Sequence, residues 1–213
     1  EKRYKVRMSA TDPQCPFPET ADIHTSSDEY AARFAGPAGA WMLAVQERLA
    51  RGLLRDFAGA SLLDVGGGHG QLAVPLGRAG WKVTVLGSAE SCRHRLREAE
   101  AAGHCTFQVG NVIALPFPDR SFDVVLCFRL LTHCERWPAV VRELCRVARR
   151  AVIVDYPTGQ SLNAVAPALF GAKRKFEKNT RTWRLFRHRE VFAEFARSGF
   201  APAAVRTPFF LPV

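Results

Sequence analysis

An apolar stretch that runs into an acid and then into glycines constrains this chain more than any other feature. It reads Ser61-Leu62-Leu63-Asp64-Val65-Gly66-Gly67-Gly68-His69-Gly70. Glycine is needed where φ is positive or where a Cβ would collide with a bound molecule, and three in succession exceed what an ordinary connection requires. We therefore expect a strand, then a turn whose backbone approaches a nucleotide-like ligand.

The spacing of the glycines indicates which kind of ligand. A dinucleotide site requires G-x-G-x-x-G, but Gln71 occupies the place of its last glycine. No Gly-Lys-Ser/Thr follows, which excludes a phosphate loop of the Walker type. With Asp64 ahead of the turn, the pattern resembles motif I of the class I S-adenosylmethionine (SAM)-dependent methyltransferases. In that family the turn lies against the amino-acid and ribose parts of SAM.

From about residue 60 onward, predicted strands and helices alternate. We expect strands over 60–65, 82–86, 105–109, 122–128 and 151–155, and helices over 71–79, 88–102 (with Ser88 as its N-cap) and 137–147. This alternation predicts an α/β fold with a doubly wound, mostly parallel sheet. Ligands of such sheets bind beyond the carboxyl ends of the strands, at the switch point of the strand order.

A second motif strengthens the resemblance. Residues 110–125 read GNVIALPFPDRSFDVV, which is similar to the G-D-A-x-x-L-P-F-x-D-x-S-F-D-x-V stretch of the methyltransferase 11-type branch that includes ubiquinone and menaquinone methyltransferases. The resemblance covers roughly residues 60–155. It implies a Rossmann-like fold, SAM as cofactor, and methyl transfer to a small-molecule or lipid-like acceptor. The cofactor-binding residues that it implies are Asp64, Gly66, Gly67, Gly68, His69, Gly70, Leu86, Gly87, Ser88, Asn111, Val112, Phe128, Arg129 and Tyr30.

Two positions depart from the family pattern. The acid that usually ends the second strand and accepts hydrogen bonds from both ribose hydroxyls is replaced by Gly87, although Ser88 or Glu90 could substitute for it. Asn111 stands where the family has Asp, and its amide oxygen can still accept from the adenine amino group. These departures leave open a second interpretation, a protein that binds SAM or its product without catalysis.

His133, just after the fourth predicted strand, is the candidate catalytic base if the acceptor must lose a proton. A histidine at this place also occurs in the family without a catalytic role. His69, inside the glycine turn, is expected to contact the cofactor rather than to act as a base.

The N-terminal region, residues 1–58, is predicted to form an extension and lid helices, and residues 59–213 the SAM-binding domain. Helix-start chemistry at Ser26–Glu29 precedes Tyr30 and Phe34 on one face. Gly36-Pro37 is expected to break that helix before a longer one over 38–56, with Trp41 packed against the sheet. Tyr30 or Arg33 would close over the methionine part of SAM or simply pack, and residues 1–25 look extended.

A basic insertion over 156–186 is expected to cover the substrate. Residues 173–189 carry eight Lys or Arg against one acid, Glu177, with aromatic residues between them. The stretch either attracts an anionic acceptor or nucleic acid, or is a solvated helix face. The base-gripping Asn/Asp-Pro-Pro-Tyr/Phe sequence and a Pro-Cys nucleophile are absent from the chain, which disfavours methylation of nucleic-acid bases. A basic RNA-associated methyltransferase stays an alternative.

The composition fits one domain, because 213 residues at 47% hydrophobic content can bury an α/β core. Apolar runs are strand-length, and no secretory signal is recognisable, so a cytoplasmic protein without a transmembrane segment is expected. The scattered cysteines predict free thiols and no metal site. A sixth strand is expected over 203–210. The end at Val213 leaves no residues for the family's seventh strand, so we expect either a fragment, which the start at Glu1 also suggests, or a sheet that is completed differently. The exposed sheet edge could pair in a homodimer.

Overall fold

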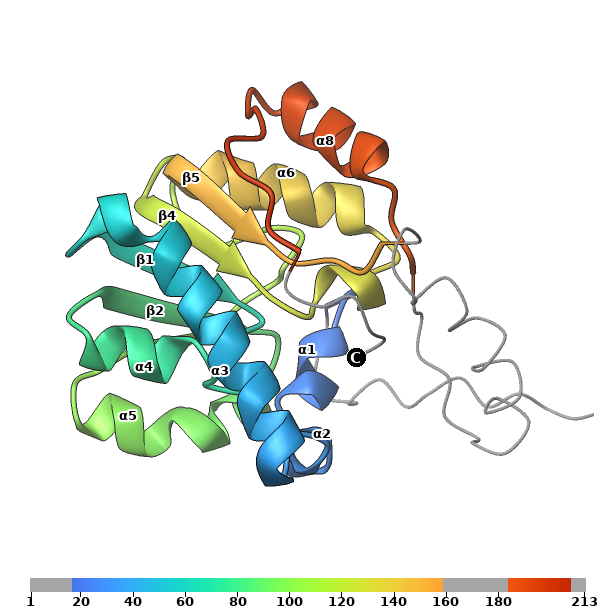
Figure 1. Cartoon of the computed structure of the whole chain (residues 1–213). Helices are drawn as coiled ribbons and strands as arrows, with labels where there is room; N and C mark the ends of the chain where they lie inside the picture. Colours follow the sequence, from blue (N-terminus) through green and yellow to red (C-terminus); the bar gives the residue numbers. More distant parts are fainter. Residues whose placement is uncertain (1–16, 159–183, 208–213) are drawn as a thin grey trace, which may run out of the picture.

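A computed structural model describes residues 17–158 and 184–207 of the chain, and all structural statements below concern these residues. Helices and strands alternate along most of this length (Figure 1). The elements are α1 (Ala21–Thr25), α2 (Asp28–Ala32), α3 (Gly36–Leu53), η1 (Arg55–Phe57), β1 (Ser61–Val65), α4 (Ala73–Arg78), β2 (Lys82–Gly87), η2 (Glu90–Leu96), α5 (Arg97–Ala101), β3 (Thr106–Val109), β4 (Phe122–Cys127), η3 (Leu131–His133), α6 (Trp137–Val147), β5 (Ala148–Val154) and α8 (His188–Arg197).

The strands form one parallel sheet in the order β3-β2-β1-β4-β5. Leu63 of β1 pairs with Thr84 of β2 on one side and with Val125 of β4 on the other. The order reverses between β1 and β4, so the predicted doubly wound sheet is confirmed. The predicted sixth strand is wrong over 203–207, which carry no strand, and its remainder lies outside the described residues.

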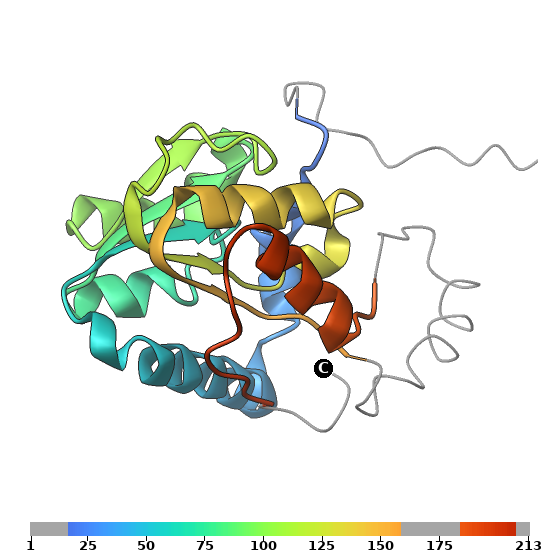
Figure 2. The ribbon, with the colours of Figure 1, turned by 90° about the horizontal axis from the view of Figure 1, so that it is seen from above.

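Each face of the sheet is covered by its own helices, as the view from above shows (Figure 2). Alternate strand residues point to opposite faces, so neighbours such as Leu62 and Leu63 enter different clusters. Leu62 packs with residues of α3, α4 and α5, whereas Leu63 packs with residues of α6 and α8. Both faces of the central strands are therefore buried, as a parallel sheet requires.

Two expectations about the helices are wrong, namely Ser88 as an N-cap and Trp41 packed against the sheet. Ser88 is not an N-cap, because its side chain donates to Asp22 and the segment after it forms η2 before α5. The expected break between a short helix and a longer one is present, because α2 ends at Ala32 and α3 follows; α3 begins at Gly36 rather than at residue 38, since proline suits the first helical turn, and it ends at Leu53. Trp41 on α3 is 59% exposed and lies outside both core clusters.

The N-terminal segment lies at the carboxyl ends of the strands, next to the end of β1 (Figure 1). Ser27 caps α2 as predicted, because its Oγ accepts from the Tyr30 N–H at 3.1 Å. The expectation of an extended N-terminus is wrong over 21–25, which form α1. Residues 1–16 lie outside the described residues. We call residues 17–35 the N-terminal cap. The division into a 1–58 region and a 59–213 domain stays a prediction.

Within the described ranges, the model contains no helix that is both long and apolar enough to cross a bilayer.

Candidate functional site

The glycine turn after β1 is shaped by its own surroundings. Gly66 and Gly70 have φ of 76° and 78°, a conformation that favours glycine. A Cβ on Gly67 would overlap the Asp64 carboxylate, and one on Gly68 would overlap the Ser26 hydroxyl and the Cys92 carbonyl. The turn therefore needs glycines both for its backbone angles and for the protein atoms packed against it.

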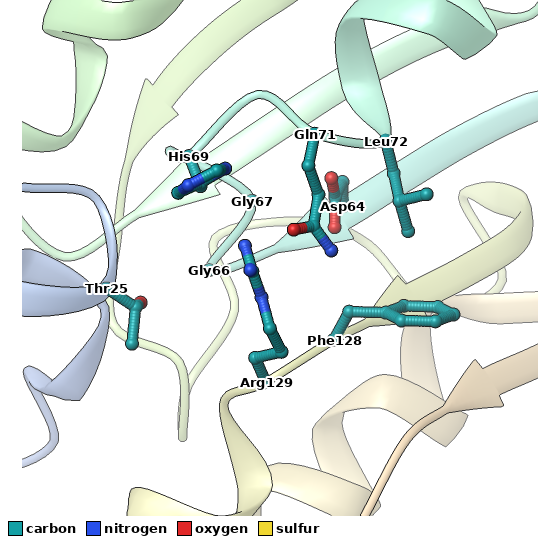
Figure 3. Close-up of a pocket in the computed structure, with 9 residues that line it drawn as sticks. All are labelled: Thr25, Asp64, Gly66, Gly67, His69, Gln71, Leu72, Phe128 and Arg129. Atoms are coloured by element: carbon teal, nitrogen blue, oxygen red, sulfur yellow. The ribbon is translucent and has the colours of Figure 1, made fainter. Parts of the chain in front are cut away.

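A small cavity lies beside this turn, beyond the ends of β1 and β4 (Figure 3). Its free volume, about 10 Å³ for the centre of a water-sized sphere, holds about one water molecule. The residues around it come from α1, β1, the glycine turn and the segment after β4. They are Thr25, Asp64, Gly66, Gly67, His69, Gln71, Leu72, Phe128 and Arg129.

Arg129 provides the positive charge of this cavity. Its backbone has φ of 56°, unusual for a residue with a side chain, and its N–H donates to Asp155 Oδ1 at 2.5 Å. The guanidinium lies 4.7 Å from the centre of the Phe34 ring and 5.3 Å from that of Tyr30. It points toward the glycine turn (Figure 3), and its buried Nη1 finds no partner among the described residues. Burial lowers the Arg129 pKa.

Two carboxylates accompany Arg129. Burial raises the pKa of Asp64 to about 7 and that of Asp155 to about 6, and in both cases the nearby Arg129 opposes the shift. Asp155 also accepts from Gln46 Nε2 at 3.3 Å, and Gln46 accepts in turn from Gln71 Nε2 at 2.9 Å. Gln71 Oε1 is buried without a partner in the described part of the chain.

His69 is held at the edge of the cavity by aromatic contacts with Tyr30 and Phe34. Burial, together with the charges of Arg129 and Arg95, lowers its pKa to about 3, so the ring is neutral near pH 7. Neither ring nitrogen has a hydrogen-bond partner within residues 17–158 and 184–207. A neutral imidazole with such a low pKa suits a binding contact better than a base.

The end of β2 not only lacks the acid of the family pattern but also lacks the space for one. A Cβ on Gly87 would lie 2.7 Å from Cys92 Cβ and 2.9 Å from the Phe107 ring, so no acidic side chain fits there without rearrangement. Of the two expected substitutes, Glu90 is exposed and pairs with Arg93 at 3.0 Å. Ser88 is buried and gives both its N–H and its hydroxyl to the Asp22 carboxylate of α1, at 2.6 and 2.5 Å.

The remaining predicted site residues are spread around the same edge of the sheet. Leu86 and Val112 are buried in the core cluster that Ala21 of α1 also contacts. Asn111 uses its side-chain oxygen to accept from the Ile113 N–H at 3.1 Å. His133 ends η3, is half-buried and does not line the cavity, so its role as a base stays a prediction.

Several residues of this region were not anticipated. Asp155 directly follows β5, and an acid after a buried strand is a signal that could have revealed it. Gln46 and Asp22 carry no such signal, because each lies on a helix far from its partner in sequence. Only the packing of α1 and α3 against the strand ends brings them to the site.

The two ends of the predicted SAM site fit the cofactor differently. At the methionine end, the unpaired polar atoms of Arg129, His69 and Gln71 around a glycine turn suit an amino acid's charged groups. At the predicted adenosine end, the Asp22 carboxylate of α1 lies against Ser88 and accepts from both its N–H and its hydroxyl. The polar groups therefore fit the amino-acid part of SAM, whereas the donors of Ser88 are already used by α1.

Comparison with known proteins gives consistent relationships. A family model described as "Methyltransferase domain" matches residues 63–154. The chain is 36% identical to 27-O-demethylrifamycin SV methyltransferase of Amycolatopsis mediterranei, over 48% of this chain and 39% of that protein. It is 30% identical to ubiquinone biosynthesis O-methyltransferase of Paramagnetospirillum magneticum, over 68% of this chain and 60% of that protein. The chain thus spans 39% and 60% of the lengths of these two relatives, less than two thirds in both cases.

Among solved structures, magnesium protoporphyrin IX methyltransferase of Synechocystis PCC 6803 with bound S-adenosylhomocysteine (SAH) has a similar fold. The TM-score is 0.68 at 19% identity, over 86% of this chain and 90% of that one. At this identity the likeness concerns the fold alone.

Proposed function

We propose that the protein transfers a methyl group from SAM to a small-molecule or lipid-like acceptor, on the basis of the match of residues 63–154 to the methyltransferase domain family. The observation that carries the proposal is the group of unpaired polar atoms around the glycine turn. Arg129 Nη1, both ring nitrogens of His69 and Gln71 Oε1 are buried without partners in the described chain. Buried polar groups are normally paired, so their number at one cavity supports a polar ligand.

Each residue of the methionine end has a role in the proposal. Arg129 holds the carboxylate of the ligand by charge-assisted hydrogen bonds, while Asp155 fixes its backbone and the Tyr30 and Phe34 rings fix its side chain. When its carboxyl is ionised, Asp64 provides a negative charge for the ligand's ammonium group. SAM supplies an electrophilic methyl group, so the protein's contribution to the rate is mainly positioning.

The acceptor class is supported by relatives rather than by this cavity. The rifamycin and ubiquinone methyltransferases carry small-molecule or lipid-like acceptors in their names. His133 would accept the acceptor's proton where one must be lost. Most of the basic insertion that suggested an anionic acceptor, residues 159–183, lies outside the described residues.

A second candidate, binding of the cofactor without turnover, is favoured by one observation. Gly87 removes the usual ribose acceptor, and α1 takes the donors of Ser88. This candidate shares the binding site of the first and differs only in the absence of methyl transfer.

Calorimetry tests the binding step. We expect SAH and SAM to bind the full chain, and adenosine, which lacks the amino-acid part, to bind at least tenfold more weakly. No heat with SAH or SAM at millimolar concentration would contradict the proposal. Transfer of radiolabelled methyl to a panel of phenols, quinols and carboxylic acids then separates the enzyme from the non-catalytic candidate.

A further inference from the structure

We propose that α1 is an internal competitor of the cofactor: it closes the adenosine end of the cleft, latched by Asp22 on Ser88, and must move away before SAM binds. The inference rests on the proposed function and adds a regulatory step to it.

The latch itself consists of a buried carboxylate and neutral donors. Asp22 is fully buried, and it accepts from the Ser88 N–H, the Ser88 hydroxyl and the Cys92 thiol, the last at 3.4 Å. None of the ion pairs found in the described chain involves Asp22. A buried carboxylate without a cation is costly, so hydrogen bonds such as those from Ser88 and Cys92 must stabilise its charge.

The position of the latch coincides with the place where the fold binds its ligand. The Asp22 Cβ lies 3.5 Å from the point where a Cβ of Gly66 would be, and the carboxylate reaches the end of β2. Ser26 fills the space beside Gly68 in the same way. Atoms of the cap therefore occupy the cleft between the glycine turn and β2, which a ligand of the parallel sheet would use.

The cap is tied to the protein by two further carboxylates, one on each side of the latch. Glu19 accepts from the Arg136 N–H at the start of α6, at 2.6 Å. Asp28 binds Arg95 at 2.6 Å and His94 at 3.1 Å on η2, but it is exposed to solvent. The closed cap thus spans the cleft from α6 to η2. Of its three carboxylate contacts, the contact of Asp22 lies inside the cleft.

If α1 competes with SAM, the apparent Kd for SAM equals the intrinsic Kd divided by the fraction of molecules in which α1 has moved away. Removing the latch should therefore tighten cofactor binding while it destabilises the ligand-free protein. If Asp22 instead were a ribose acceptor that replaces the missing acid at Gly87, the same substitution would weaken binding. The two readings differ in the sign of one measurement.

The experiment compares SAH binding by the full-length wild type with that of Asp22→Ala and of the milder Asp22→Asn. The matched control is Glu29→Ala, an acid of the same cap that is exposed on α2. We expect at least tenfold tighter SAH binding and a lower melting temperature for Asp22→Ala, a smaller change of the same sign for Asp22→Asn, and no change for the control.

Weaker or unchanged SAH binding by both Asp22 variants, with binding by the wild type intact, would overturn the latch and leave the proposed function standing. Absence of SAH binding by every variant would overturn both. Binding by Asp22→Ala alone would support both.

Two measurements keep the test independent of how well Asp22→Ala folds. In the wild type, saturating SAH should speed hydrogen exchange of the Ser26 and Ser27 amides, which are bonded within the cap; slower exchange would overturn the proposal. In Asp22→Cys, a disulfide to the adjacent Cys92 should abolish SAH binding, and reduction should restore it. Wild-type affinity in the oxidised variant would overturn the latch.

Discussion

The two ends of the cleft at the carboxyl edge of the sheet differ in how well their polar groups are satisfied. Beside β1 and β4, Arg129, His69 and Gln71 keep buried polar atoms without partners in the described chain. Beside β2, Ser88 and Asp22 satisfy one another. The difference teaches that polar groups at one end of a cleft can stay available to a ligand while the chain's own helix pairs with the polar groups at the other end.

The largest effect is expected from pH, through the carboxyl of Asp64. Its pKa is raised from 3.8 to about 7, so the folded state keeps a proton that the unfolded state releases above pH 4. The unfolding free energy should fall as pH rises from about 4 to about 7, on the order of 4 kcal/mol for this group. Urea unfolding of the ligand-free protein at a series of pH values measures it.

Asp64→Asn is the control, because its side chain stays neutral throughout. The variant should lose most of this pH dependence and keep a smaller part from Asp155, whose pKa is about 6. If the unfolding free energy of the wild type and of Asp64→Asn changed equally with pH, Asp64 would not be the group that holds the buried proton.

Gly67→Ala tests how tightly the glycine turn is packed against Asp64, at the end of the cleft beside β1 and β4. The new Cβ would overlap the Asp64 carboxylate, and we expect a loss of about 1–3 kcal/mol of unfolding free energy, as for other overpacked sites. Gly52→Ala on α3 meets no atom within 4 Å and should stabilise the protein by about 0.5–1 kcal/mol. A neutral Gly67→Ala would mean that the turn is looser than described.

Arg129→Ala separates the two ends by ligand chemistry. Loss of a charge-assisted hydrogen bond of about 1.5–3 kcal/mol should weaken SAH binding roughly 10- to 100-fold. The affinity for 5′-methylthioadenosine, which lacks the amino and carboxyl groups, should stay within about twofold. Calorimetry with both ligands gives the comparison, and an equal loss for the two would place Arg129 outside the methionine end.

Ser27→Ala should give the smallest effect. The substitution removes a hydrogen bond within the N-terminal cap, which covers the end of the cleft beside β2. Removing the N-cap of α2 costs about 1 kcal/mol in typical helices. Because that loss falls on the closed cap, SAH affinity should rise about two- to fivefold. Limited proteolysis of the cap and SAH titration test the prediction, and tighter protection of the cap in the variant would contradict it.

Much of the fold could be predicted from the sequence, because it depends on local patterns. The α6 helix begins and ends as expected, and β1, β2, β3 and β4 each lie within two residues of their predicted bounds. The residue types of the methionine end follow from motif I and from the segment after β4. Among the errors, those at Ser88 and Trp41 arise where a local signal for capping or burial is overridden by a long-range contact or by the position of α3.

By itself, the sequence determined the alternation of strands and helices, the glycine turn and the resemblance to methyltransferases, since each depends on residues close together in the chain. Only the tertiary structure decided that Asp22 meets Ser88 and that the Arg129 guanidinium packs over the neighbouring Tyr30 and Phe34 rings. The physical reason is that these contacts join segments far apart in sequence. Their free energy depends on burial and geometry that appear only once the helices pack on the sheet.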